Sequence, residues 1–406
     1  MAEHPLRDGL TLLTHPSVGR MFVAYLVSYT GTAMAPIAMA FGVLNLTGST
    51  ADASFVIAAP TLAAIGVLLI GGAVADRYSR HKTLYLSDLL SMASQLTMAW
   101  LFLSAQATVP LLTVLMLVNG IAVAFHQPAA AGFIIQLVAP KDLQATNALL
   151  GAARNGAVAG GAALGGILVA TIGAGATLLV DAATFALSAL LVYSLKPNPQ
   201  KRSASLSLLE DLRLGWREFS SHTWLWAIVL QFSLVFAAYE AVLALVGPAV
   251  AREQMGGARD WGFIVAGFGI GTLAGGLLGM RIMPRHPMRF GTICVFSFSL
   301  LHFALALPPP VWLAMLAACI AGAAGQLFAV LWYTTLQRKV PGEMLSRVSA
   351  YDHLGSISLA PLGIVAGGYL YEALGYRPTL MIAALAVIVP TALVLCVRDV
   401  RQMTLD

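Results

Sequence analysis

Residues 72–82 read Gly72-Ala-Val-Ala-Asp76-Arg77-Tyr-Ser-Arg80-His-Lys82, and they separate two apolar runs at 53–74 and 83–104. Each run is long enough to cross a bilayer as a helix, since about 20 apolar residues suffice. A short loop rich in arginine and lysine between two such runs is typical of the cytoplasmic side of a membrane protein. This stretch therefore predicts two spanning helices joined in the cytoplasm.

The composition of the whole chain agrees with this prediction. Of its 406 residues, 59% are hydrophobic and only 10% are charged, whereas about 25% of the residues of a soluble protein are charged. Twelve spans of about 20 residues need roughly 240 apolar positions, which this composition supplies. Strands of outer-membrane barrels alternate apolar and polar residues, but these runs are unbroken. We therefore expect an all-α polytopic membrane protein.

Twelve apolar runs are predicted to span the membrane, and one long polar segment divides them six and six. The runs are 18–46, 53–74, 83–104, 110–128, 147–171, 176–196, 222–250, 260–281, 290–307, 311–335, 348–372 and 376–397. The predicted domains are an N-terminal six-helix bundle (1–196), a cytoplasmic linker (197–221) and a C-terminal six-helix bundle (222–406).

The basic residues lie unevenly between the two sides of the membrane. Nineteen of the 23 lysines and arginines fall on the side of the N-terminus, and three on the other side: Arg252, Arg259 and Arg377. Basic residues in short loops mark the cytoplasmic side, so both termini are expected there. Because the positive charge is spread over loops, nucleic acid is not an expected partner, although the net charge is +5.

The linker contains an amphipathic stretch. Ser207-Leu-Leu-Glu210 has the form of a capping box that opens a helix. The apolar side chains that follow recur at steps of three and four: Leu209, Leu212, Trp216 and Phe219. We expect this helix to lie along the inner membrane surface; a substrate or nucleotide site there is the alternative.

The two halves resemble each other in parallel order. Val138-Ala-Pro-Lys-Asp142 before the fifth span matches Val340-Pro-Gly-Glu343 before the eleventh. Repeated halves are typical of secondary transporters. The sequence contains no zinc-protease, nucleophile-elbow or phosphate-loop motif, so we expect no enzyme activity, cofactor or metal. Transport would then be passive or driven by a gradient.

The loop at 72–82 resembles the signature loop of the major facilitator superfamily, whose pattern is Gly-x-x-x-Asp-Arg-x-x-Arg-Arg/Lys. Glu210-Asp-Leu-Arg-Leu-Gly-Trp-Arg217 resembles the branch that contains the enterobactin exporter and macrolide efflux proteins. The resemblance covers essentially the whole chain. It implies twelve helices in two parallel six-helix pseudo-repeats and transport by alternating access across a bacterial inner membrane.

The resemblance also implies a gating latch made by Gly72, Asp76, Arg77, Arg80 and Lys82. Asp76 would face the N-terminus of the eleventh span, where a helix dipole favours an anion. The second half has methionine at the equivalent position, Met280, which implies a latch on one side only. The alternative is a basic loop that sets topology and nothing more.

Three carboxylates, Asp88, Asp181 and Glu240, lie well inside apolar runs. A charge there is costly, so such residues are functional candidates by default. Glu240, near the middle of the seventh span, is the first candidate for proton coupling or for binding a cation. A structural pairing with Arg154 or with a histidine is the alternative. Asp88 is the candidate nearest to the loop arginines, and we expect it to support them and not to carry protons.

By resemblance, spans one, four, seven and ten line a central substrate cavity. Aromatic and polar side chains suit a bulky amphipathic ligand, and packing between helices is their alternative role. The candidates are Tyr25, Tyr29, Asn119, Arg154, Gln231, Tyr239, Gln326, Trp332 and Tyr333. Arg154 must be paired or hydrated; it would bind an anionic substrate or neutralise Asp88 or Asp352.

Two predicted spans carry glycines at four-residue spacing, which lets helices approach closely in lipid. By resemblance, spans five and eight are expected to meet at the interface of the halves, where such a surface would let them slide; static packing is the alternative. The interface glycines are Gly156, Gly160, Gly165, Gly267, Gly271 and Gly275.

Together these features predict an exporter of hydrophobic or amphipathic compounds that exchanges them for protons and works as a monomer. An importer, lipid flippase or facilitator of the same fold is the alternative within transport. A membrane receptor without transport is a remote alternative, because such a receptor would be expected to carry a sizeable soluble domain.

Overall fold

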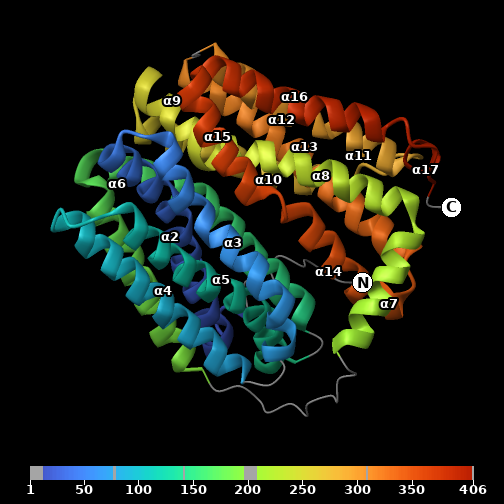
Figure 1. The fold of residues 1–406 in the computed structure, drawn as a ribbon. Helices are drawn as coiled ribbons and strands as arrows, with labels where there is room; N and C mark the ends of the chain where they lie inside the picture. Colours follow the sequence, from blue (N-terminus) through green and yellow to red (C-terminus); the bar gives the residue numbers. More distant parts are fainter. Residues whose placement is uncertain (1–11, 76–78, 140–141, 196–207, 308–309, 405–406) are drawn as a thin grey trace. The chain divides into compact units, whose positions relative to one another are not determined.

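The computed structural model describes residues 12–75, 79–139, 142–195, 208–307 and 310–404, and within these ranges the chain is helical with no strand. Eleven of its helical stretches are long and apolar enough to cross a membrane. The helices form two compact units (Figure 1), of which the first comprises residues 1–46 and 59–203 and the second residues 47–58 and 204–406. The all-α membrane fold predicted from the sequence is confirmed.

The first unit contains five long helices. They are α2 (Pro16–Thr47), most of α3 (Thr50–Ala75), α4 (Arg80–Leu103), α5 (Val109–Leu137) and α6 (Leu143–Tyr193). Helix α4 packs against both α5 and α6. The helix ends fall within a few residues of the predicted runs, except that α5 continues nine residues beyond the predicted end at 128.

Helix α6 is a pair of spans joined without a loop. Its 51 residues would be about 76 Å long at 1.5 Å per residue, more than twice the roughly 30 Å of a bilayer core. Gly173 breaks it with φ 83° and ψ 169°, a conformation that glycine adopts without steric penalty. The break falls between the predicted runs 147–171 and 176–196, so the two halves of α6 are the fifth and sixth spans.

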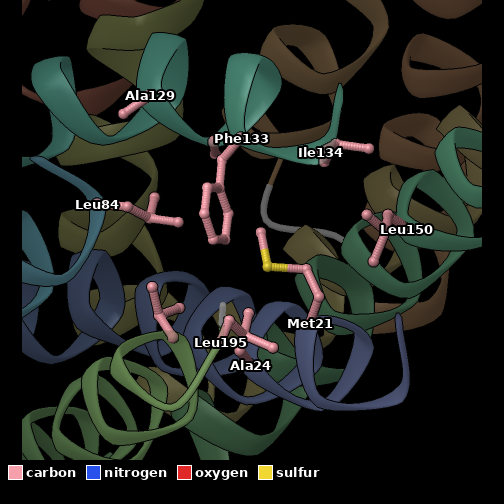
Figure 2. Close-up of a cluster of buried hydrophobic side chains, with 10 residues drawn as sticks. Met21, Ala24, Leu84, Ala129, Phe133, Ile134, Leu150 and Leu195 are labelled. Carbon is pink, nitrogen blue, oxygen red and sulfur yellow. The ribbon is translucent and has the colours of Figure 1, made fainter. Parts of the chain in front are cut away.

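The end of the first unit at which α4 begins has a buried apolar core (Figure 2). Phe133 of α5 points into the centre of this core, where Met21 of α2 and Leu84 of α4 meet it. His81 stacks on Phe133, with ring centroids 5.3 Å apart and planes 12° apart. Arg80 donates from Nη1 to the carbonyl of Gly132 at 3.1 Å. Arg80 and His81, at the start of α4, therefore contact α5 through a hydrogen bond and a ring contact.

The second unit contains the remaining helices, several of which continue directly into the next. They are α7 (Leu208–Ser221), α8 (Thr223–Ala241), the π-helix η2 (Val242–Val246), α9 (Gly247–Gln254), α10 (Ala258–Gly279), α11 (Pro287–Val295), α12 (Phe298–Ala306), α13 (Val311–Lys339), α14 (Gly342–Ile357), α15 (Ala360–Leu374), α16 (Tyr376–Val394) and α17 (Arg398–Gln402). Helix α13 packs against α10, α11 and α12, while α8 packs against α14, α15 and α16.

The linker helix α7 packs on α14 within the second unit. Trp216 and Phe219 both pack their rings near Tyr351, at centroid distances of 5.5 and 5.9 Å. Phe219 is buried, whereas Trp216 is more than half exposed. The apolar face predicted for this helix is therefore partly used by α14, and its exposed part remains the surface that we expect to meet lipid.

The first turns of α3 belong to the second unit, where Glu372 of α15 caps them. Ser49 donates from Oγ to Glu372 Oε1 at 2.5 Å, and the amide of Ala51 donates to the same oxygen at 3.0 Å. Thr50 also donates to the carbonyl of Gly368 at 2.9 Å. A carboxylate at a helix N-terminus satisfies free amides and interacts favourably with the helix dipole.

Candidate functional site

A cavity of about 220 Å³ lies inside the second unit, between α8, α13 and α14. Its walls are mainly apolar and aromatic, with three polar side chains contributed by α14. The lining residues that matter below are Phe232, Phe236, Phe328, Trp332, Tyr333, Asp352, His353 and Ser356. Of the predicted cavity residues, Trp332 and Tyr333 line this space.

The aromatic wall of the cavity is a series of nearly parallel rings. Phe232 and Phe328 have centroids 5.1 Å apart and planes 8° apart. Phe328 and Trp332 follow at 6.0 Å and 16°, and Phe232 and Phe236 at 6.4 Å and 21°. Residues four apart lie one above the other on a helix, so each helix contributes two rings to one face. Offset parallel rings are a favourable aromatic arrangement.

Asp352 is the acidic group of this cavity. Its side chain is buried and accepts hydrogen bonds from Trp332 Nε1, at 2.9 Å, and from the side chain of Ser356. Both donors are neutral, and among the described residues no lysine, arginine or histidine forms an ion pair with it. A buried carboxylate without a counter-charge is costly. The cavity thus contains an acidic group whose negative charge no described neighbour neutralises.

From the sequence, Asp352 is expected only as a possible partner of Arg154. The structure gives it Trp332 and Ser356 as partners instead. A signal was present, because Tyr351-Asp352-His353 is a polar triplet inside the apolar run 348–372. Asp352 lies only four residues after the predicted start of that span, so the triplet resembles the edge of the preceding loop.

Glu240 lies one turn beyond this cavity on the same face of α8. It follows Phe236 by four residues and Phe232 by eight, which is the spacing of one helical face. The side chain is partly exposed, and within the described part of the chain no ion pair to it is formed. The chain turns into the π-helix η2 two residues later, and π-helical segments often occur at functional sites.

Asp88 forms a buried polar centre in the first unit. Ser188 donates to its Oδ2 at 2.7 Å, and His126 Nε2 lies 3.1 Å from its Oδ1. The Asp88 side chain is fully buried, while that of His126 is 16% exposed. The described partners of Asp88 are thus His126 and Ser188; since Arg77 lies outside the described residues, support of the loop arginines by Asp88 stays a prediction.

Two tyrosines of α2 and Arg154 of α6 come together near this centre. The rings of Tyr25 and Tyr29 have centroids 5.4 Å apart. The Tyr29 hydroxyl is hydrogen-bonded to Arg154, and Asp88 lies close enough to influence both tyrosines electrostatically. Helix α2 thus faces α4 and α6 with the polar residues that the sequence assigned to the cavity.

Asp181 is fully buried in the second half of α6. Thr184 donates to its Oδ1 at 3.2 Å, while no described residue hydrogen-bonds its Oδ2. The carboxyl group lies against the backbone of α2 at Gly31, where a Cβ atom would collide with it. Asp181 therefore has no described cationic partner, and it remains a candidate for holding a proton.

Several predicted site residues lie outside the cavity lining. Gln231 donates to Thr391 Oγ1 of α16 at 3.0 Å, so it joins two helices. The ring of Tyr239 packs on Phe298 with centroids 4.6 Å apart. Gln326 lies over Gly276 of α10. These three side chains were expected to face substrate, and the structure places them in helix packing, the alternative role.

Asn119 and the latch complete the predicted set. Asn119 is buried in α5, and its amide nitrogen has no hydrogen-bond partner among the described residues. Asp76 and Arg77 lie outside the described residues, and Gly72 lies in the last turn of α3. Lys82 is exposed, and Arg80 bonds to α5 through the carbonyl of Gly132. The predicted latch therefore stays a prediction.

The glycines of α10 do not form the predicted sliding surface. A Cβ atom on Gly267, Gly271 or Gly275 would collide with the backbone of α13 at Met315, Cys319 or Ala323. The small residues thus allow two helices of the same unit to pack backbone to backbone. The prediction that this face meets the other half is wrong for these residues.

The glycines of α6 divide into two groups. A Cβ atom on Gly165 would press against Met34 of α2, inside the same unit. A Cβ atom on Gly156 or Gly160 would have no described atom within 4 Å. Gly165 therefore serves packing within the first unit, while the role of Gly156 and Gly160 in a moving interface stays a prediction.

Comparison with known proteins gives consistent matches along the chain. The model of the Major Facilitator Superfamily matches residues 21–352. The multidrug efflux pump Tap of Mycolicibacterium fortuitum is 25% identical over 396 residues, covering 94% of this chain and 96% of that protein. The enterobactin exporter EntS of Shigella boydii is 26% identical over 367 residues, covering 87% and 86%.

Solved structures share the fold at low identity. The nucleoside transporter NupG has a TM-score of 0.74 at 14% identity and covers 94% of this chain and 98% of that chain. A bacterial homologue of the human lysosomal transporter Spinster, in an inward-facing and unoccupied conformation, has a TM-score of 0.76 at 16% identity, covering 95% and 96%.

Proposed function

This chain belongs to the major facilitator superfamily, and on that premise we propose that it exports hydrophobic or amphipathic small molecules in exchange for protons. Its membership makes it a multi-pass membrane transporter of small molecules and not an enzyme. The observation that carries the proposal is the aromatic cavity with its buried carboxylate, because such a lining binds ring-bearing amphipathic compounds.

The direction of transport is supported by the two groups of relatives, a multidrug efflux pump and an enterobactin exporter. Proton exchange is supported by four intramembrane carboxylates that form no ion pair with a described lysine or arginine: Asp88, Asp181, Glu240 and Asp352. Such groups are costly when charged in a membrane. Carboxylates in such positions form the proton relays of many pumps and transporters.

We also propose that the protein lies in the bacterial cytoplasmic membrane as a monomer with both termini in the cytoplasm. The distribution of lysine and arginine supports this orientation. A reporter fused to the C-terminus, active only in the cytoplasm, is expected to be active. A reporter that is active only outside the cytoplasm should be inactive there, and the reverse pattern would contradict the orientation.

The loop at 72–82 is proposed to latch the cytoplasmic side through Asp76. Asp76→Asn should impair transport and raise the labelling of cytoplasmic-side cysteines introduced in the substrate path. Asp399→Asn is the matched control, because it removes an exposed carboxylate from α17, outside this loop. Normal transport and normal labelling in Asp76→Asn would remove the latch.

Transport is tested with preloaded cells that express the gene or carry an empty vector. Export predicts faster loss of Nile red, a neutral dye, or rhodamine 6G, a cationic dye, and an uncoupler should abolish the difference. Faster uptake would instead identify an importer. Equal rates with and without expression, for both dyes and with the protein present in the membrane, would contradict the proposed function.

A further inference from the structure

We infer that the cavity between α8, α13 and α14 is a subsite for the cationic, ring-bearing end of a substrate, with Asp352 as its counter-charge. The inference rests on the proposed transport function and narrows the substrate class that the site accepts. It is carried by three properties of the cavity, namely its size, its charge and the orientation of its rings.

The size of the cavity indicates a subsite and not a complete binding pocket. Its volume is about 220 Å³, below the range of about 300–1,000 Å³ that is usual for pockets holding a whole drug-sized ligand. One or two fused rings with a charged nitrogen fill such a space. The rest of a larger amphipathic substrate would then extend beyond α8, α13 and α14.

The charge of the cavity selects the sign of the ligand. Asp352 is buried, and its described partners are the neutral donors Trp332 and Ser356. A ligand cation supplies the missing counter-charge, and a charge-assisted contact in a partly desolvated site is stronger than a neutral one. An anionic ligand meets the opposite situation, because like charges repel strongly where water is scarce.

The other titratable groups around Asp352 do not reverse this selection. Tyr333 of α13 and His353 of α14 also line the cavity, and both side chains are exposed. A neutral tyrosine adds no charge, and neither does a histidine in its neutral form. The charge inside the cavity is therefore that of Asp352.

The aromatic wall selects the shape of the ligand. Ring faces carry partial negative charge and attract cations. The ring planes of Phe232 and Phe328 are 8° apart, and those of Phe328 and Trp332 are 16° apart. A flat ring bearing a delocalised positive charge can lie parallel to these faces, whereas a bulky tetrahedral ammonium cannot approach them so closely.

Helical spacing explains how the chain builds this subsite. Each of the three helices contributes a pair four residues apart: Phe232 and Phe236, Phe328 and Trp332, Asp352 and Ser356. Such pairs face the same side of a helix. The hydrogen bond from Trp332 Nε1 also holds the Asp352 carboxylate against the aromatic wall, so Trp332 is a positioning residue as well as part of the wall.

The test measures binding of three matched ligands to the purified full-length protein. They are 10-methylacridinium (cation), acridine at mildly alkaline pH (neutral) and acridine-9-carboxylate (anion), which share one ring system. Fluorescence titration is expected to rank their affinities in that order. Asp352→Asn should weaken the binding of 10-methylacridinium by about tenfold or more, the range of a charge-assisted contact. The same variant should change the affinity for acridine by less than about twofold.

Three further variants separate charge from shape and folding. Asp352→Glu keeps the charge and should retain most of the preference for the cation. Asp399→Asn removes an exposed carboxylate from α17, outside the cavity, and should bind like the wild type. Phe328→Leu should weaken the binding of 10-methylacridinium and of acridine by the same factor, because it removes ring surface and no charge. Gel filtration and circular dichroism confirm that each variant is folded.

The outcomes distinguish this inference from the proposed function. If folded Asp352→Asn still prefers the cation over acridine as the wild type does, the subsite is wrong. If the wild type binds none of the three ligands while it still exports Nile red, the subsite is also wrong and export stands. If the wild type binds the cation through Asp352 but moves no dye in cells, export fails and the subsite stands.

Discussion

His126 Nε2 on α5 lies 3.1 Å from Asp88 Oδ1 on α4, inside the first unit and beside the hydroxyl of Ser188. The pair connects two helices at a position where the Asp88 side chain is fully buried. A buried carboxylate needs such partners, and removing one leaves an uncompensated polar group.

This relationship predicts strong coupling between the two residues. His126→Leu should lower the free energy of unfolding of the purified protein by about 1–3 kcal/mol, because Asp88 loses a buried partner. Asp88→Asn should cost less, since an amide can still accept a bond from Ser188. The double variant should be more stable than the sum of the single changes predicts, by at least about 0.5 kcal/mol. Additive effects would show that the pair is not coupled.

Glu240 is predicted to exchange a proton for substrate. Glu240→Gln keeps the shape and hydrogen-bonding capacity but fixes the group as neutral, so substrate-driven proton release should vanish. Transport of cationic substrates should fall more than that of neutral ones, because only cations use the freed charge. The measurement is the pH change in weakly buffered purified protein when rhodamine 6G is added.

Two other carboxylates serve as controls for that measurement. Asp88→Asn and Asp181→Asn should reduce proton release less than Glu240→Gln does, since Asp88 already has an ion-pair contact with His126 and a hydrogen bond from Ser188. Normal release from Glu240→Gln protein would assign Glu240 a structural role. Loss of release in Asp181→Asn alone would move the coupling to α6.

Close packing of α10 on α13 makes a sharp prediction for two neighbouring glycines. A Cβ on Gly271 would collide with the backbone of Cys319, whereas a Cβ on Gly276 would meet only Gln326 Cγ at 3.8 Å. Gly271→Ala should therefore lower stability by about 1–3 kcal/mol through overpacking. Gly276→Ala should be neutral or raise it by up to about 1 kcal/mol, because alanine favours helix.

Thermal unfolding of the two purified variants, followed by circular dichroism, distinguishes these effects. Equal melting temperatures for Gly271→Ala and Gly276→Ala would mean that α10 and α13 separate easily. That result would restore a sliding role for the glycine face.

The cap on α3 predicts a local effect. Glu372→Ala removes the acceptor shared by the Ser49 hydroxyl and the Ala51 amide, so the first turn of α3 should fray. Hydrogen exchange of the segment around Ala51 should become faster, while the segment around Phe133 in the first unit should keep its rate. Unchanged exchange around Ala51 would show that this cap does not hold the turn.

Much of the fold follows from local patterns that need no tertiary information. Apolar runs of bilayer length predict the spans because lipid cannot satisfy an open backbone, and Gly173 falls between two of the predicted runs. The loop at 72–82 indicates the family through its own residue pattern. By resemblance the tenth span was expected to line a substrate cavity, and Trp332 and Tyr333 of that span line the cavity between α8, α13 and α14.

What the sequence could not decide is which face of each helix meets which neighbour. Every span is apolar around most of its circumference, so periodicity does not show which face meets a neighbouring helix. Gln231 or Tyr239 was therefore as good a cavity candidate as Phe232. Glycine spacing indicates close approach but does not name the partner, and the partner of Gly271 is α13.

The sequence by itself therefore determined the membrane class, the spans and the family, because hydrophobic length, loop charge and one loop motif are properties of short segments. Only the tertiary structure decided that Asp352 joins Trp332, that Asp88 joins His126, and that three helices enclose an acidic aromatic cavity. Those pairings unite residues from different spans, and they depend on how helices rotate and pack, which no single segment encodes.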